Sequence, residues 1–101
     1  MASFVLPNTS FTGKVTLVTG GSSGIGRATA HAFAEAGATV VLSDIDASGG
    51  ETVAQALRDN GSKAAFIQAD VSQAADVAQM VAETVARYAR GRALPIVPVA
   101  A

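Results

Sequence analysis

The chain contains no cysteine and a single histidine, His31. The absence of cysteine excludes disulfides, thiolate nucleophiles and cysteine-bound zinc. One histidine is too few for a histidine metal cluster, and it leaves little basis for a histidine-dependent catalytic triad. We therefore predict no metal site, and we assign His31 to a helix surface or a packing contact.

Charge and long apolar runs are also scarce. Charged residues make up 15% of the chain, and 7 Lys and Arg against 8 Asp and Glu leave a formal net charge of −1. The basic surface that binds nucleic acids or anionic lipids is therefore absent. The longest apolar stretch, residues 94–101, is far shorter than the roughly 20 residues that span a bilayer, and the first residues lack the basic region of a secretory signal. We expect a cytoplasmic protein without nucleic-acid or membrane partners.

The sequence is rich in hydrophobic residues, and segments typical of strands alternate along it with segments typical of helices. Half of the 101 residues are hydrophobic, which is typical of one small folded domain and not of a disordered tail. Apolar runs at residues 14–19, 39–43 and 64–68 predict strands, separated by segments of helical periodicity. Short connections of this kind imply right-handed crossovers and a parallel sheet. The expected fold class is α/β: half of a doubly wound fold, with three parallel strands in the order 3-2-1 and helices on both faces.

Each predicted helix has one apolar stripe at helical spacing. The first helix ends at Gly37, and the second, over residues 49–60, inserts Val53 and Leu57 into the core. Ser72 is the candidate N-cap of the third. The first helix has the predicted stripe Ile25, Ala28, Thr29, Ala32, Phe33 and Ala36, and the third has Val77, Met80, Val81, Val85 and Tyr88.

A glycine-rich segment joins the first predicted strand to the first helix. It reads Thr19-Gly20-Gly21-Ser22-Ser23-Gly24-Ile25-Gly26. Such a turn offers unpaired N–H groups and the positive end of a helix dipole to a phosphate, with no Cβ in the way. Gly20 permits the tight turn, Gly24 the approach of a pyrophosphate and Gly26 close helix packing, while Ser22 and Ser23 offer hydroxyls to phosphate or ribose. A plain glycine-rich turn is the alternative, but the position between strand and helix favours nucleotide binding.

This spacing resembles the Thr-Gly-x-x-x-Gly-Ile-Gly fingerprint of the short-chain dehydrogenase/reductase family, and the resemblance extends over residues 11–88. It implies a Rossmann fold, a nicotinamide dinucleotide cofactor and hydride transfer between that cofactor and an alcohol or carbonyl substrate. The cofactor-binding residues so implied are Gly20, Ser22, Ser23, Gly24, Ile25, Gly26, Asp44, Ile45, Asp70 and Val71.

Asp44 follows the second predicted strand and bears on the choice of cofactor. A carboxylate at this point accepts hydrogen bonds from the ribose hydroxyls of NAD and repels the 2′-phosphate of NADP. No basic residue that would favour NADP stands at Ser22, Ser23 or Ile45. The alternative, a solvated loop carboxylate, suits Asp46 better. We therefore expect NAD as the cofactor in preference to NADP.

Asp70 and Val71 close the third predicted strand. In the family this pair lies along the adenine, with the carboxylate accepting from the exocyclic amine and the next backbone N–H reaching a ring nitrogen. An acid at a helix start, stabilised by the helix dipole, is the alternative and is compatible with that role.

The family's catalytic residues have no counterpart in these 101 residues. The family uses a tyrosine with a lysine four positions later, together with a serine and an asparagine. Tyr88 is the single tyrosine, Arg92 stands four positions after it, and both lysines, Lys14 and Lys63, come earlier. We assign no catalytic residue and place Tyr88 in the core. The expectation is a truncated, inactive NAD-dependent oxidoreductase of this family, with a non-catalytic dinucleotide-binding module or an inactive fragment as alternatives.

The last dozen residues depart from the alternating pattern. A fourth strand is expected beside the first, but Pro95 and Pro98 cannot sit in a central strand because each removes a donor from the ladder. Truncation and a shifted reading frame after about Tyr88 are the two explanations. The predicted organisation is a leader (1–12), an NAD-binding Rossmann half-domain (13–89) and an atypical tail (90–101). Without a fourth strand, residues 15–18 would form an exposed edge open to self-association.

Overall fold

The computed structural model describes residues 11–22, 24–89 and 96–100. Strands and helices alternate in the order β1 (Val15–Thr19), α1 (Gly24–Glu35), β2 (Thr39–Asp44), α2 (Ala47–Asp59), β3 (Ala64–Gln68), α3 (Ala74–Thr84), a π-helical turn η1 (Val85–Ala89) and β4 (Ile96–Ala100). Over the described part of the chain, no helix is long and apolar enough to span a bilayer.

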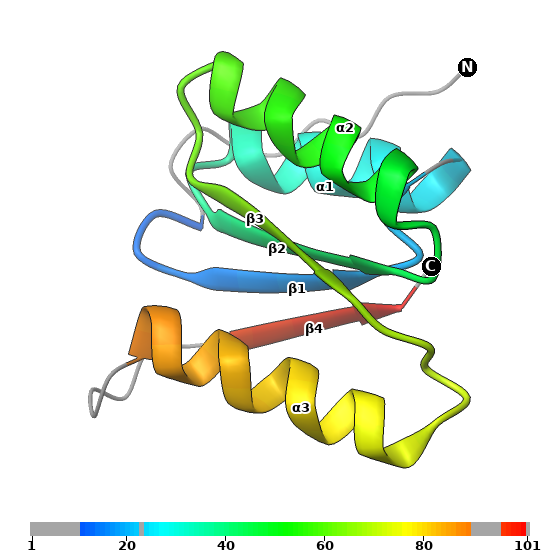
Figure 1. Ribbon diagram of the computed structural model, residues 1–101. Helices are drawn as coiled ribbons and strands as arrows, with labels where there is room; N and C mark the ends of the chain where they lie inside the picture. Colours follow the sequence, from blue (N-terminus) through cyan, green and yellow to red (C-terminus); the bar gives the residue numbers. More distant parts are fainter. Residues whose placement is uncertain (1–10, 23, 90–95, 101) are drawn as a thin grey trace.

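The strands form one parallel sheet in the order β3-β2-β1-β4. Helices α1 and α2 cover one face of this sheet, and α3 covers the other (Figure 1). The predicted partial Rossmann arrangement, with the strand order 3-2-1 and helices on both faces, is therefore confirmed. The bounds of β3 match the prediction, and those of β1 and β2 differ from it by one residue each.

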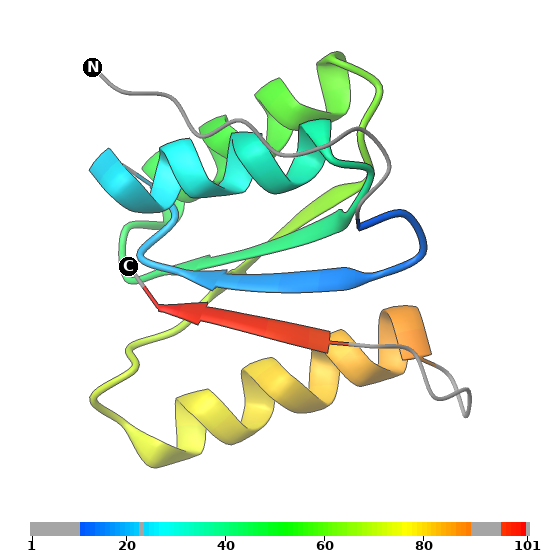
Figure 2. The same ribbon diagram turned by 180° about the vertical axis from the view of Figure 1, so that it is seen from behind.

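The fourth strand is where the prediction was wrong. β4 pairs in parallel with β1, from Val15 opposite Ile96 to Thr19 opposite Ala100 (Figure 2). Pro98 is compatible with this pairing because β4 is the outer strand of the order, where one side of the backbone needs no ladder partner. Pro95 lies outside the described residues. As a result β1 is an inner strand and not the exposed edge that self-association was expected to use.

The two faces of the sheet carry separate hydrophobic cores, because successive side chains of a strand point to opposite faces. The core beneath α1 and α2 contains Val18, Ala30, Val40, Leu42, Val53, Ala54, Leu57 and Ala64. The core beneath α3 contains Val15, Leu17, Val41, Ile67, Ala69 and Met80, with Val77 and Tyr88 packed against it. The predicted burial of Val53 and Leu57 is confirmed, as is the packing role of Tyr88.

The predicted stripe of α1 was wrong at its first position. Ile25 is 71% exposed, while Gly26 and Ala30 are buried and Phe33 packs partly against the core. Gly26 and Ala30 lie four residues apart on one face, and their small size lets the helix approach the sheet closely. Apolar spacing alone does not reveal which side of a helix start faces the sheet.

The predicted stripe and cap of α3 were also partly wrong. Val81 and Val85 are 42% and 40% exposed, whereas Thr84 is buried and donates its hydroxyl to the Met80 carbonyl at 2.8 Å. This local bond satisfies the hydroxyl, so a polar residue can face the core. The N-cap residue is Gln73, whose side chain makes no capping hydrogen bond. Ser72, the predicted cap, donates its hydroxyl to Asp70 instead.

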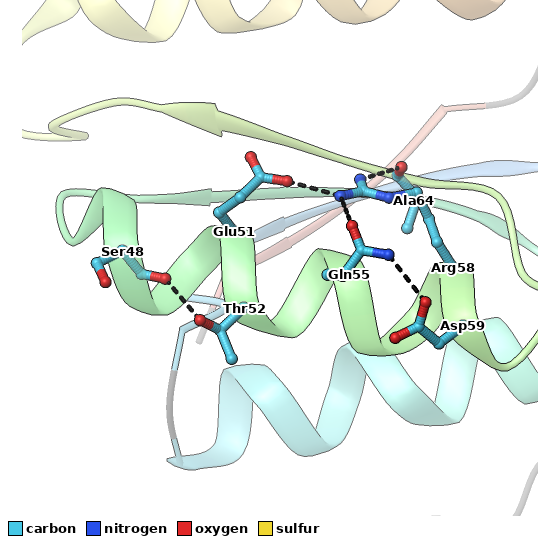
Figure 3. Close-up of polar contacts among 7 residues, drawn as sticks. All are labelled: Ser48, Glu51, Thr52, Gln55, Arg58, Asp59 and Ala64. Atoms are coloured by element: carbon cyan, nitrogen blue, oxygen red, sulfur yellow. Dashed lines mark hydrogen bonds and ion pairs between the residues drawn. The ribbon is translucent and has the colours of Figure 1, made fainter.

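Helix α2 is fastened at both ends by side chains. At its start the carboxylate of Asp46 accepts from the Gly49 amide at 3.0 Å, so the helix begins two residues before the predicted position. Near its end Arg58 donates to the carbonyl of Ala64, the first residue of β3, and to two side chains of its own helix (Figure 3). The Arg58 network thereby links the end of α2 to the start of β3.

Candidate functional site

The predicted cofactor residues gather at one edge of the sheet. Parallel strands place their carboxyl ends together, and in open α/β sheets ligands bind outside these ends. β1, β2 and β3 end there at Thr19, Asp44 and Gln68. The structure places Gly20, Ser22, Gly24, Ile25 and Gly26 after β1, Asp44 and Ile45 at the end of β2, and Asp70 and Val71 after β3. Ser23 lies outside the described residues.

Glycines shape the turn between β1 and α1. Gly20 and Gly24 have φ values of 69° and 59°, in the left-handed region that side chains disfavour. Among the described residues, no atom beyond the chain neighbours and the backbone of α1 itself lies within 4 Å of the place where a Cβ on Gly24 would stand, so the start of α1 borders open space. A ligand can therefore approach the first amides of this helix.

Gly21 is a site-shaping residue that the sequence analysis did not single out. Its amide donates to the Ser43 carbonyl at 3.2 Å, and a Cβ there would lie 2.6 Å from Cδ2 of Leu42. The turn thus lies directly on β2, and a residue larger than glycine would have to displace the buried Leu42 side chain. The Gly20–Gly21 doublet was the available signal, but only the tertiary structure shows that Gly21 packs on Leu42.

Asp44 is held by three hydrogen bonds. Its Oδ2 accepts from the hydroxyl of Ser22 at 2.7 Å and from the Ser22 amide at 3.1 Å, and its Oδ1 accepts from the Asp46 amide at 3.0 Å. Burial raises the pKa of the Asp44 carboxyl, but the bonds from Asp46 and Ser22 outweigh burial and hold that pKa below its usual value. The Asp44 side chain is therefore ionised at neutral pH and fixed in direction.

Asp70 has a similar partner one strand further along. The hydroxyl and amide of Ser72 donate to its Oδ1 at 2.7 and 3.0 Å. These two bonds lower the pKa of the Asp70 carboxyl. The amide of Asp70 donates to the carboxylate of Asp76, in the first turn of α3, at 2.9 Å. Ser72 and the Asp76 side chain of α3 therefore order the loop that follows β3.

A pocket of about 180 Å³ lies between these two loops. It is lined by Gly20, Ser43, Asp44, Ile45, Ala69, Asp70 and Val71. Ile45 and Val71 are 65% and 58% exposed, although both are apolar. Exposed apolar side chains next to ionised carboxylates suit a flat ring system that carries hydrogen-bond donors. Among the described residues no group of three or more His, Cys, Asp or Glu side chains could hold a metal ion.

Known proteins share both this sequence pattern and this fold. The family model described as short chain dehydrogenase matches residues 14–96. Tropinone reductase-like 1 of Erythroxylum coca is 46% identical over 90 residues, which cover 89% of this chain and 32% of that protein. The chain thus spans about a third of the length of this curated relative.

Solved structures agree with the sequence comparison. The citronellol catabolism dehydrogenase of Pseudomonas aeruginosa PAO1 superposes with a TM-score of 0.81 and 33% identity, over 87% of this chain and 37% of that one. A short chain dehydrogenase/reductase from Burkholderia phymatum, solved in complex with NAD, gives a TM-score of 0.77 and 33% identity, over 78% of this chain and 28% of that one. The chain therefore belongs to the short chain dehydrogenase family.

Proposed function

We propose that these residues bind NAD, in preference to NADP, as the cofactor-binding part of an oxidoreductase that transfers hydride between NAD(H) and an alcohol or carbonyl substrate. The observation that carries the proposal is the fixed, ionised carboxylate of Asp44 beside an open glycine turn. Family membership supports the cofactor class, because a related structure was solved with NAD.

The donor and acceptor groups of the site fit the parts of a dinucleotide. The turn from Gly20 to Gly26 and the positive end of α1 would hold the pyrophosphate. Asp44 would accept from the ribose that carries the adenine, and the adenine would lie in the pocket between Ile45 and Val71, beside Asp70. When bound, the nicotinamide would supply the hydride acceptor or donor, while the residues described here would hold the adenosine and pyrophosphate parts of the cofactor.

We further propose that the 101 residues do not turn over substrate by themselves. Tyr88, the single tyrosine, packs against the core beneath α3. It lies in η1, which follows the last turn of α3, at the opposite end of the sheet from the glycine turn (Figure 1). A tyrosine there cannot reach a cofactor held at the carboxyl ends of the strands. Dinucleotide binding without catalysis is therefore the activity proposed for this chain alone.

Titration with NADH and NADPH, followed by the fluorescence of the reduced nicotinamide, tests the cofactor proposal. We expect NADH to bind more tightly than NADPH, and Asp44→Ala to reduce this preference about tenfold, as expected for one hydrogen bond to a charged group. The control Glu35→Ala removes an exposed carboxylate at the far end of α1 and should leave the preference unchanged.

Two results would contradict these proposals. Failure of NADH to give a saturable signal would exclude dinucleotide binding, and an unchanged preference in Asp44→Ala would remove the role of that carboxylate. Reduction of NAD by the wild-type chain with any alcohol of a test panel would overturn the proposal that it lacks catalysis.

A further inference from the structure

The pair formed by Ser22 and Asp44 suggests how the site distinguishes two cofactors that differ by one phosphate. We propose that Ser22 is a second selectivity residue, whose hydroxyl can only accept a hydrogen bond from the cofactor and therefore favours a ribose diol over a 2′-phosphate. This inference rests on the proposed binding of a nicotinamide dinucleotide. Of the two partners expected for the Ser22 hydroxyl, phosphate or ribose, it selects the ribose.

The position of one proton is the basis of the inference. A serine hydroxyl has a single proton and two lone pairs. In Ser22 this proton is directed to Oδ2 of Asp44, at 2.7 Å from the hydroxyl oxygen. A hydrogen bond to an ionised carboxylate is roughly twice as strong as a neutral one. As long as Asp44 is ionised, Ser22 therefore has only lone pairs to offer a ligand.

The hydrogen-bond acceptor positions of the Asp44 carboxylate are also largely occupied. A carboxylate has about four acceptor positions. Ser22 uses two of them on Oδ2 and the Asp46 amide uses one on Oδ1, and the Ile45 amide also interacts with this carboxylate. Little acceptor capacity is therefore left on Asp44 itself. The lone pairs of Ser22 Oγ add the acceptors that the hydroxyl donors of a ribose diol require.

A 2′-phosphate offers Ser22 and Asp44 acceptors in place of donors. Its oxygens are negatively charged acceptors, and neither Ser22 nor Asp44 has a proton for them. Its charge also adds to that of Asp44, and like charges brought together at a binding surface oppose binding. The two residues therefore reject NADP together, Asp44 by its charge and Ser22 by the direction of its proton.

A nearly identical pair at the next strand supplies a matched control. Ser72 donates its hydroxyl to Asp70 at 2.7 Å and its amide to the same carboxylate at 3.0 Å. Asp70 borders the proposed adenine position, and adenine is common to both cofactors. Removal of the Ser72 hydroxyl should therefore change the affinities for NADH and NADPH by the same factor.

The test is a double-mutant cycle in the full 101-residue chain, with Ser22→Ala, Asp44→Ala and the double variant titrated with NADH and NADPH. We expect Ser22→Ala to lower the preference for NADH about fivefold, the effect of one neutral hydrogen bond. Ser22→Thr keeps the hydroxyl and should retain the preference. In the Asp44→Ala background the proton of Ser22 has no side-chain acceptor at position 44, so the hydroxyl can donate as well as accept. Ser22→Ala should then change the preference little. The control Ser72→Ala should leave the preference at the wild-type value.

The outcomes separate this inference from the proposed function. If the wild type prefers NADH and Ser22→Ala keeps that preference, the role of Ser22 is refuted while NAD binding stands. An equal loss of affinity for both cofactors in Ser22→Ala also refutes it, because a purely structural role gives that result. If the wild type binds neither dinucleotide, both proposals fail.

Discussion

Replacement of Gly50 by alanine should destabilise the fold through one neighbour, Phe66. Gly50 is buried in the first turns of α2. A Cβ at this position would overlap Cε1 and Cδ1 of the Phe66 ring and would lie 2.7 Å from its Cζ. Phe66 stands on β3 and packs against the core beneath α1 and α2. The added methyl group must therefore move the ring or separate α2 from the sheet.

Two opposing effects set the size of the change. Alanine is more favourable than glycine inside a helix by about 1 kcal/mol. Insertion of a methyl group into a packed core typically costs about 1–3 kcal/mol. Three ring atoms within clashing distance place Gly50→Ala in the upper part of that range. We expect a net loss of about 1–2 kcal/mol in the free energy of unfolding.

Removal of the Phe66 ring should make Gly50→Ala stabilising instead of destabilising. Phe66→Val suits a strand and removes the Cδ1, Cε1 and Cζ atoms that clash. In that background only the helix preference remains, so Gly50→Ala should stabilise by about 0.5–1 kcal/mol. The coupling energy between the two sites is thus within the range of about 0.5–3 kcal/mol known for residues in contact.

Urea unfolding followed by far-UV circular dichroism measures these changes, since the chain has no tryptophan and a single tyrosine. Ser48→Ala, at an exposed position of the same helix, serves as a control for helix preference and should stabilise slightly. The reasoning is refuted if Gly50→Ala equals or exceeds the wild type in stability, or if it destabilises equally with and without the Phe66 ring.

Three further predictions concern α2, α3 and pH. Arg58→Met should lower the free energy of unfolding by about 1 kcal/mol, because it loses the bond to β3 and two bonds within the helix. Arg87→Met, which breaks an exposed 3.5 Å ion pair, should cost less than about 0.5 kcal/mol in the same urea assay. Gln73→Ser should raise the thermal midpoint, since it supplies the side-chain cap that α3 lacks, worth about 0.5–1 kcal/mol; an unchanged midpoint would contradict this. Because the pKa of folded Asp44 is lowered, its ionised form stabilises the fold above the unfolded pKa near 3.8, and this contribution disappears as the pH falls through the folded pKa. Urea midpoints measured from neutral to acidic pH should therefore fall, and Ser22→Ala should reduce this fall.

Local rules account for the parts of the fold that the sequence predicted. Short apolar runs predicted the three strands of the order 3-2-1, and β3 matches residue for residue. Gly37 and Gly61 adopt φ values of 96° and 91°, as their place after helices requires. The strand–turn–helix around Gly20 is likewise encoded within a few neighbouring residues, so the proposed binding segment could be recognised without coordinates.

Contacts between distant segments decided the rest, because sequence patterns describe a residue's own element and not its partners. β4 forms only by pairing with β1, some eighty residues earlier, so the outer position that accommodates Pro98 was not visible in its composition. The Ser22–Asp44 bond joins residues 22 positions apart, and no pattern within either segment predicts it. The sequence determined which residues stand at the carboxyl edge of the sheet; tertiary packing determined where their protons point, because each hydrogen bond needs both of its partners in place.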